Sequence, residues 1–266
     1  MATREALKMI RKRKGLSQEE LAFQLGISQR HVSFVESGRA KPSRDLLLDW
    51  LHTLETELVF CNEILIETGY APAYSERSLS DPELQQTNQA LSQLLAAHDP
   101  MPAMVLDAFW NIHQLNQGAA WLAAQLMPDL VAEVGPGPLN MLDLLVHPNG
   151  FLSALLNLEE VGPILFAHLK AEARALPQMQ KRVDQVSHVL IQKLGEAAAS
   201  RIQVQPKSPV LTSRFQSPWG PLSFFSMFTT FGSPQDISLE SLRVEHMFAA
   251  DESTRKVLTQ QVHRTQ

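Results

Sequence analysis

The strongest constraint on the fold lies between residues 16 and 39, where small, turn-forming and branched apolar residues occur at fixed distances. Ala22 is small enough to lie where two helices cross, and Gly26, four residues later, can adopt the backbone conformation of a sharp turn. Val32 and Val35 are spaced so that both face a common core. An isolated Ala-x-x-x-Gly would be weak support, but the complete set predicts two short helices packed at a steep angle.

Helix start and stop signals surround this pair of helices. Ser17 followed by Glu20 forms a capping box at the start of one helix, and Ser28 is placed to cap the next. Apolar residues at helical spacing predict three more helices, with boundaries marked by Gly15, Ser43 and Gly69. Residues 1–70 are therefore predicted to form one all-α domain of five short helices.

The remaining residues follow a different pattern. Residues 71–83 carry Pro, Ser and Tyr without a clear period and are predicted to connect two domains. Beyond them, strands are expected at 103–107, 110–115, 210–215, 222–230 and 242–248, and helices at 84–97, 118–126, 150–174 and 179–200. Two strands, then helices, then three strands indicate an α+β domain with an antiparallel sheet over residues 84–266.

The charge of the chain is divided unevenly. Residues 1–44 have a net charge of +6, whereas the other 222 residues have a net charge of −11. A basic N-terminal part on an acidic body indicates that only this part meets a polyanion. The run from Arg11 to Lys14, taken alone, is equally well explained as a solvated charged segment.

Composition narrows the remaining function classes. No apolar run approaches the roughly 20 residues of a membrane span, and the N-terminus lacks the apolar stretch of a signal peptide. The single cysteine, Cys61, forbids an intrachain disulfide, so we expect a soluble cytoplasmic protein that has no membrane partner. An enzyme is not expected, because the chain lacks Gly-x-Ser-x-Gly, a phosphate-binding glycine loop and paired Cys or His clusters. Since the histidines also lack metal-ligand spacing, we expect neither a metal nor another cofactor.

Three segments resemble the phage-repressor (Cro/XRE) helix-turn-helix family. They are Leu-Ser-Gln-Glu-Glu-Leu-Ala at 16–22, Gly-Ile-Ser at 26–28 and Val-Glu-Ser-Gly-Arg at 35–39. The resemblance covers about residues 4–68. It implies a DNA-binding domain whose third helix enters the major groove, and a homodimer on a two-fold symmetric site in double-stranded DNA.

The same resemblance assigns roles at matching positions. Gln29 and Arg30, just inside the third helix, should reach base edges, where Gln favours adenine and Arg favours guanine through paired contacts. Phe34 is placed to pack on a thymine methyl group, although this position is commonly polar in the family. Ser33 is expected to face solvent or phosphate, and Gln18 to bind phosphate. The predicted DNA-binding residues are Gln18, Ser28, Gln29, Arg30, Ser33, Phe34, Arg39, Lys41 and Arg44.

The C-terminal region resembles the MmyB-like ligand-binding domain, a PAS-like fold, over about residues 84–260. The similarity lies in residues 102–107, 110–112, 116, 140–148, 225–232 and 250–254. It implies a pocket between a curved sheet and flanking helices, with a small apolar ligand such as a fatty acid. Ten residues are candidates for its lining: Leu106, Trp110, Ile112, Leu115, Trp121, Phe166, Leu169, Phe224, Phe228 and Phe248. The same residues would equally describe an ordinary core, and His113-Gln114 stands where the family often has apolar residues.

Two hypotheses follow from these observations. In the first, a sequence-specific transcription regulator senses an apolar ligand through its C-terminal domain, and the ligand changes the placement of two DNA-binding domains. In the alternative, the C-terminal domain serves only for dimerisation or protein interaction. A bound lipid in the purified protein would distinguish the first from the second.

Overall fold

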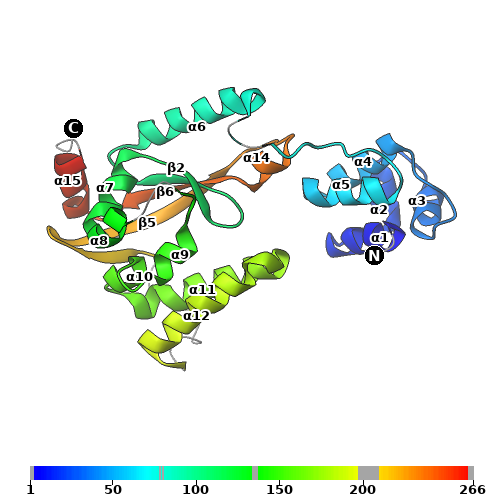
Figure 1. The fold of residues 1–266 in the computed structure, drawn as a ribbon. Helices are drawn as coiled ribbons and strands as arrows, with labels where there is room; N and C mark the ends of the chain where they lie inside the picture. Colours follow the sequence, from blue (N-terminus) through cyan, green and yellow to red (C-terminus); the bar gives the residue numbers. More distant parts are fainter. Residues whose placement is uncertain (1–2, 78, 80, 134–136, 197–209, 263–266) are drawn as a thin grey trace. The chain divides into compact units, whose positions relative to one another are not determined.

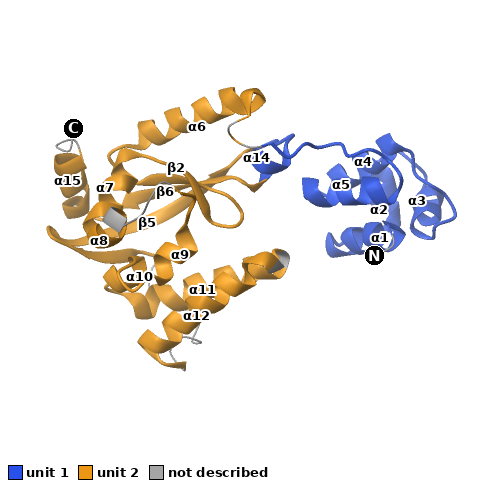
Figure 2. Ribbon diagram, in the orientation of Figure 1, with its two compact units in different colours: residues 1–78, 232–240 blue, residues 79–231, 241–266 orange. Residues whose placement is uncertain are grey.

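The computed structural model describes residues 3–77, 79, 81–133, 137–196 and 210–262. The chain divides into two compact units (Figure 2). Unit 1 comprises residues 1–78 and 232–240, and unit 2 comprises residues 79–231 and 241–266. Unit 1 is therefore built from two segments that lie far apart in the sequence.

The N-terminal segment of unit 1 forms five helices within residues 3–67 (Figure 1): α1 (Thr3–Arg13), α2 (Gln18–Gln24), α3 (Gln29–Glu36), α4 (Arg44–Thr53) and α5 (Leu58–Glu67). The capping box at the start of α2 is complete. Ser17 Oγ accepts a hydrogen bond from the backbone N–H of Glu20 at 3.1 Å, and Glu20 Oε2 accepts one from the N–H of Ser17 at 2.7 Å. Ser28 and Ser43 cap α3 and α4. The predicted five-helix domain is confirmed.

The turn between α2 and α3 has the predicted construction. Gly26 adopts a φ of +65°, in the left-handed region that side chains disfavour. Ala22 is buried in the packing of unit 1, as the small-residue position requires. This turn sets the direction in which α3 leaves α2.

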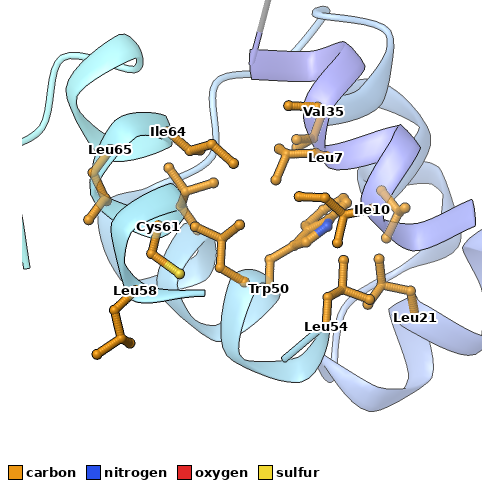
Figure 3. Close-up of a cluster of buried hydrophobic side chains, with 14 of the residues drawn as sticks. Leu7, Ile10, Leu21, Val35, Trp50, Leu54, Leu58, Cys61, Ile64 and Leu65 are labelled. Carbon is orange, nitrogen blue, oxygen red and sulfur yellow. The ribbon is translucent and has the colours of Figure 1, made fainter. Parts of the chain in front are cut away.

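The core of unit 1 gathers around the fully buried Trp50 of α4 (Figure 3). Side chains from all five helices meet there, among them Leu7, Ile10, Leu21, Val35, Leu54, Ile64 and Leu65. Val32 and Val35 place the inner side of α3 in this core. The other side of α3 is thereby turned to solvent.

Cys61 is part of this core, as its position on the apolar side of a helix predicts. Burial, reinforced by the charge of Glu240, raises the pKa of the Cys61 thiol to about 12. Because the thiolate is the reactive form, we expect a thiol reagent at pH 8 to label native protein on the order of a thousandfold more slowly than unfolded protein. Stopped-flow labelling with and without guanidinium chloride measures both rates. Equal rates would contradict the burial of this side chain.

Residues 232–240 complete unit 1. They include most of α14 (Ile237–Ser241), and Ile237 packs against the apolar core. Asp236 is buried and accepts hydrogen bonds from Ser75 Oγ at 2.8 Å and Arg77 Nη1 at 3.1 Å. The N–H of Ile237 donates to the Ser75 carbonyl oxygen at 2.9 Å. These contacts hold the segment between two strands of unit 2 within unit 1.

Unit 2 is built on one antiparallel sheet, in which the described residues form six strands in the order β3-β2-β1-β6-β5-β4. The strands are β1 (Ala103–Leu106), β2 (Asn111–Leu115), β3 (Leu139–Asn140), β4 (Ser213–Ser217), β5 (Gly220–Thr230) and β6 (Arg243–Ala249). The last strand, β6, pairs with both β1 and β5 and so lies in the middle of the sheet. The predicted α+β class with an antiparallel sheet is confirmed.

Helices cover both faces of this sheet (Figure 1). The 3₁₀ turn η1 (Pro82–Leu84) leads into α6 (Gln85–His98), which lies on one face. The other face carries α9 (Met141–Val146), α10 (Phe151–Ala154), α11 (Leu158–Ala175) and, after η2 (Pro177–Met179), α12 (Gln180–Leu194). The remaining helices are α7 (Gln117–Leu126), α8 (Pro128–Glu133) and α15 (Glu252–Gln261). No helix in the described ranges is long and apolar enough to cross a membrane.

Two predicted helices are shorter than their patterns indicated. The helix expected at 150–174 is divided into α10 and α11, because Asn157 between them accepts a hydrogen bond from the N–H of Arg214 and donates one to the carbonyl oxygen of Thr212. The helix expected at 179–200 ends at Leu194, before Gly195 with its φ of +78°. Its predicted last residues, 197–200, lie outside the described residues. The hydrogen bonds of Asn157 with residues 212 and 214 are tertiary contacts, which a local sequence pattern cannot indicate.

Candidate DNA interface and ligand cavity

The exposed side of α3 begins at its cap. Ser28 Oγ accepts a hydrogen bond from the N–H of His31 at 3.2 Å and so starts the helix. Gln29 and Arg30 follow directly, and both side chains are exposed. One solvent-facing turn of α3 therefore presents an amide and a guanidinium group. These two groups can form paired hydrogen bonds with the edges of adenine and guanine.

Phe34 lies one turn further along α3, with two guanidinium groups near its ring. The Cζ atom of Arg30 is 5.1 Å from the ring centroid, and that of Arg39 is 5.9 Å away. Both distances are within the roughly 6 Å reach of a cation–π interaction. Phe34 and Ser33 are half-buried. The ring thus orients two of the predicted DNA contacts, a role that the sequence pattern did not indicate.

A buried ion pair joins α1 to the end of α3. Arg11 Nε and Nη2 donate to the two carboxylate oxygens of Glu36 at 2.6 and 2.8 Å, and Gln18 Nε2 donates to Glu36 Oε2 at 2.8 Å. Burial opposes ionisation of Glu36, but the bonds from Arg11 and Gln18 hold its pKa below the ordinary value. Glu36 therefore interacts within the domain. Gln18, a predicted phosphate contact, is held in place by this pair.

The segment that joins α3 to α4 supplies the other predicted cations. Arg39 and Lys41 are exposed, and Arg44 is half-exposed at the start of α4. The Nζ atom of Lys41 lies 4.7 Å from the centroid of the Tyr70 ring. The Tyr70 hydroxyl in turn donates to the Pro42 carbonyl oxygen at 2.8 Å. A row of positive charge thus follows directly on the exposed helix.

Unit 2 contains a cavity of about 370 Å³ between the sheet and the helices α9–α11. Its volume falls within the roughly 300–1,000 Å³ typical of small-molecule sites. Most of the lining is aliphatic or aromatic: Met104, Trp110, Met141, Leu145, Phe151, Leu152, Leu155, Val161, Ile164, Leu165, Val210, Leu211, Phe215, Phe228 and Met247. The polar lining residues are His168, Ser213, Ser226 and Glu245. An apolar molecule with few polar atoms matches such a surface.

Two of the ten predicted pocket residues, Trp110 and Phe228, line this cavity. The other eight do not line it. Four of them pack in an apolar cluster on the same side of the sheet, namely Leu106, Ile112, Phe166 and Leu169. Trp121 and Phe224 pack in a second cluster, Leu115 is exposed, and Phe248 stacks on Phe225. Strand alternation explains the position of Phe248. Since Glu245 and Met247 face the cavity, Phe248 faces the side of α6, where its ring meets His98.

A polar cluster that the sequence did not indicate adjoins Trp110. Glu172 on α11 accepts hydrogen bonds from Trp110 Nε1 at 2.7 Å and from Arg243 Nη1 at 2.5 Å. His168 Nε2 lies 3.1 Å from Glu172 Oε1. Burial opposes ionisation of Glu172, yet the bonds from Arg243 and Trp110 keep its pKa below the ordinary value. The cluster fixes Trp110 in the cavity wall and ties α11 to β6.

The described residues contain no group of three or more His, Cys, Asp or Glu side chains that could hold a metal ion. Two histidines meet on the α6 side of the sheet, where the ring centroids of His98 and His246 lie 4.9 Å apart. His98 Nε2 lies 2.9 Å from the Met247 carbonyl oxygen. These contacts are those of packed, hydrogen-bonded rings.

Comparison with protein families yields matches over both units. Residues 87–260 match the model of the MmyB-like transcription regulator ligand binding domain. The matched residues include the sheet and the residues that line the cavity. Residues 7–60 match the helix-turn-helix model, which includes α2, α3 and their turn. No curated protein matches the chain.

Proposed function

The chain belongs to the family of MmyB-like transcription regulators, and we propose that it recognises a specific duplex sequence and senses a small apolar ligand. The exposed turn of α3 with Gln29 and Arg30, within the stretch of residues 1–44 that has a net charge of +6, supports DNA recognition. The mostly apolar cavity in unit 2 supports ligand sensing. A homodimer on a two-fold symmetric site is the assembly we propose.

A fatty acyl chain is the ligand class we propose. A methylene chain gains about 0.8 kcal/mol per CH₂ group on burial, and the aliphatic and aromatic side chains of the cavity provide the surface for it. Native mass spectrometry of the purified full chain tests this. We expect a dimer that carries a few hundred extra daltons per chain, lost on denaturation. A dimer that stays free of added mass after incubation with a lipid extract would favour a unit that only dimerises.

Lys41 provides a test of the electrostatic part of DNA binding. Each phosphate contact releases a counterion and contributes roughly 0.9 to the slope of log K against log salt. Lys41→Ala is therefore expected to weaken all duplex sequences about equally and to lower the magnitude of this slope by about 1 per half-site. Fluorescence anisotropy at several salt concentrations measures it. Lys256→Ala removes the same charge from an exposed position on α15, and an equal change in slope there would contradict a specific contact.

The chain connects the cavity to the DNA-binding unit through β5 and β6. These strands contribute Phe228 and Glu245 to the cavity lining, yet residues 232–240 between them belong to unit 1. There Glu240 Oε2 accepts a hydrogen bond from the N–H of Leu58, the first residue of α5, at 2.8 Å. A ligand that binds one arrangement of this hairpin better than another would shift the populations of the DNA-binding unit as well.

Glu240→Ala is expected to weaken this coupling. The side chain acts as an N-terminal cap of α5, where Glu57 forms no side-chain cap, and a cap contributes about 0.5–2 kcal/mol. The ratio of operator affinities with and without ligand should therefore move toward 1, by a factor of about 2 or more, while ligand affinity stays unchanged. Anisotropy titrations give this ratio. Glu57→Ala is the matched control, and an equal effect of both substitutions would contradict the role of Glu240.

A further inference from the structure

The cavity holds a carboxyl group with an unused oxygen. Glu245 lies on the central strand β6, opposite Met104 of β1 and Phe228 of β5. Its side chain lines the cavity, and its Oε1 atom accepts a hydrogen bond from Ser226 Oγ at 2.7 Å. Among the described residues, no group forms a hydrogen bond with Oε2, and this atom is not sealed inside the protein. Oε2 therefore borders on the cavity.

The charges around Glu245 leave its carboxyl group without an ionic partner in the described part of the chain. Arg243 is close on the same strand, but its Nη1 pairs with Glu172 and its guanidinium lies over the rings of Trp110 at 4.4 Å and Phe228 at 5.4 Å. His168, the other titratable lining residue, also pairs with Glu172. Burial raises the pKa of Glu245, an effect that the Ser226 bond and the charge of Arg243 oppose. Burial thus shifts the Glu245 carboxyl toward its neutral form, and a proton on Oε2 is compatible with the bond that Oε1 accepts from Ser226.

We propose that Glu245 and Ser226 bind an uncharged oxygen-bearing group of the ligand, such as a hydroxyl, ester or amide at the end of an apolar chain. This inference rests on the proposed function of the cavity. A carboxyl O–H at Oε2 can donate to an uncharged ligand oxygen. A ligand carboxylate at this place would lie beside a second carboxyl, and the nearby guanidinium of Arg243 is already paired with Glu172. A ligand ammonium would require Glu245 to ionise in a buried position, and such pairs gain little over neutral contacts.

Four probes with the same chain and different head groups test this selection. Decan-1-ol, decanamide, decanoate and decylamine are titrated calorimetrically into ligand-stripped full-length protein at neutral pH. The alcohol and the amide are expected to bind at least about tenfold more tightly than the two ions. Tighter binding of decanoate would overturn the proposal and assign the head group to Arg243, whose buried Nε and Nη2 atoms have no hydrogen-bond partner among the residues that the structure describes.

Two substitutions separate a neutral anchor from an ionic one. Glu245→Gln keeps an uncharged hydrogen-bonding group, so the order of the four affinities should persist. Glu245→Leu removes it, so decan-1-ol should bind about 3- to 10-fold more weakly and the preference should shrink. Loss of decylamine binding in Glu245→Gln, after tight binding in the unsubstituted protein, would overturn the proposal. If none of the probes binds, the proposed function of the cavity as an apolar sensor is contradicted. If the probes bind without preference, only the proposed role of Glu245 is overturned.

Discussion

Replacing Glu36 with alanine is expected to lower the free energy of unfolding of unit 1 by about 3–5 kcal/mol. The side chains of Arg11 and Glu36 are only 7% and 3% exposed, and they share two short hydrogen bonds. Without the carboxylate, the guanidinium of Arg11 would remain buried, and the Leu16 carbonyl oxygen would be its remaining partner within the described part of the chain. An uncompensated buried charge is among the most destabilising changes in a core. Urea unfolding followed by the accessibility of Cys61, the only thiol, reports on this unit.

The double variant Arg11→Met/Glu36→Leu is the matched control. Because replacing both members of a buried pair with apolar groups of similar size removes the desolvation penalty as well, it should retain a stability within about 1–2 kcal/mol of the original. A double-mutant cycle then gives the coupling energy. A loss below about 1 kcal/mol for Glu36→Ala would contradict the buried ion pair.

Arg30→Ala is expected to weaken binding to the preferred duplex about 5- to 150-fold, which corresponds to the roughly 1–3 kcal/mol of one paired base contact. The side chain is exposed at the start of α3 and lies over the ring of Phe34, which fixes its direction. Gln29→Ala should act in the same way at an adjacent base pair. Selection from a random duplex pool, followed by anisotropy on each single-base variant, measures both effects. The preference for guanine should disappear at one position of each half-site.

Arg30→Lys separates base reading from charge. Lysine keeps the positive charge but lacks the planar fork that pairs with guanine. We expect this variant to bind scrambled duplexes as well as the unsubstituted protein and to lose most of the preference at the affected position. If Arg30→Lys kept the full preference, Arg30 would act as a phosphate contact.

The elements of unit 1 could be predicted because their signals are local. Ser17, Glu20 and Ser28 cap the helices within a few residues of their own positions, and Gly26 marks the turn by its own backbone. Arg11 was harder to place, since the charge run Arg11–Lys14 is equally well explained as a solvated segment. Its spacing of four from Leu7 puts it on the apolar side of α1, and this was the available signal.

The cavity could be predicted only in part, because strand pairing and helix breaks decide which residues face it. Phe248 and Glu245 lie on one strand, and the alternation of side chains turns the carboxylate rather than the ring toward the cavity. Glu172 comes from α11 to meet Arg243, 71 residues away. The attachment of residues 232–240 to unit 1 has no local pattern either, since Glu240 and Leu58 lie 182 residues apart.

Occupancy of the cavity is expected to change the affinity of the protein for DNA. The most direct measurement is the Kd of the full-length protein for its selected duplex, once after removal of co-purified lipid and once with saturating ligand. Coupling between two sites typically amounts to about 1–3 kcal/mol, so we expect the two Kd values to differ about 5- to 150-fold. Identical values at saturating ligand would contradict this expectation, because a ligand that binds both arrangements equally shifts neither.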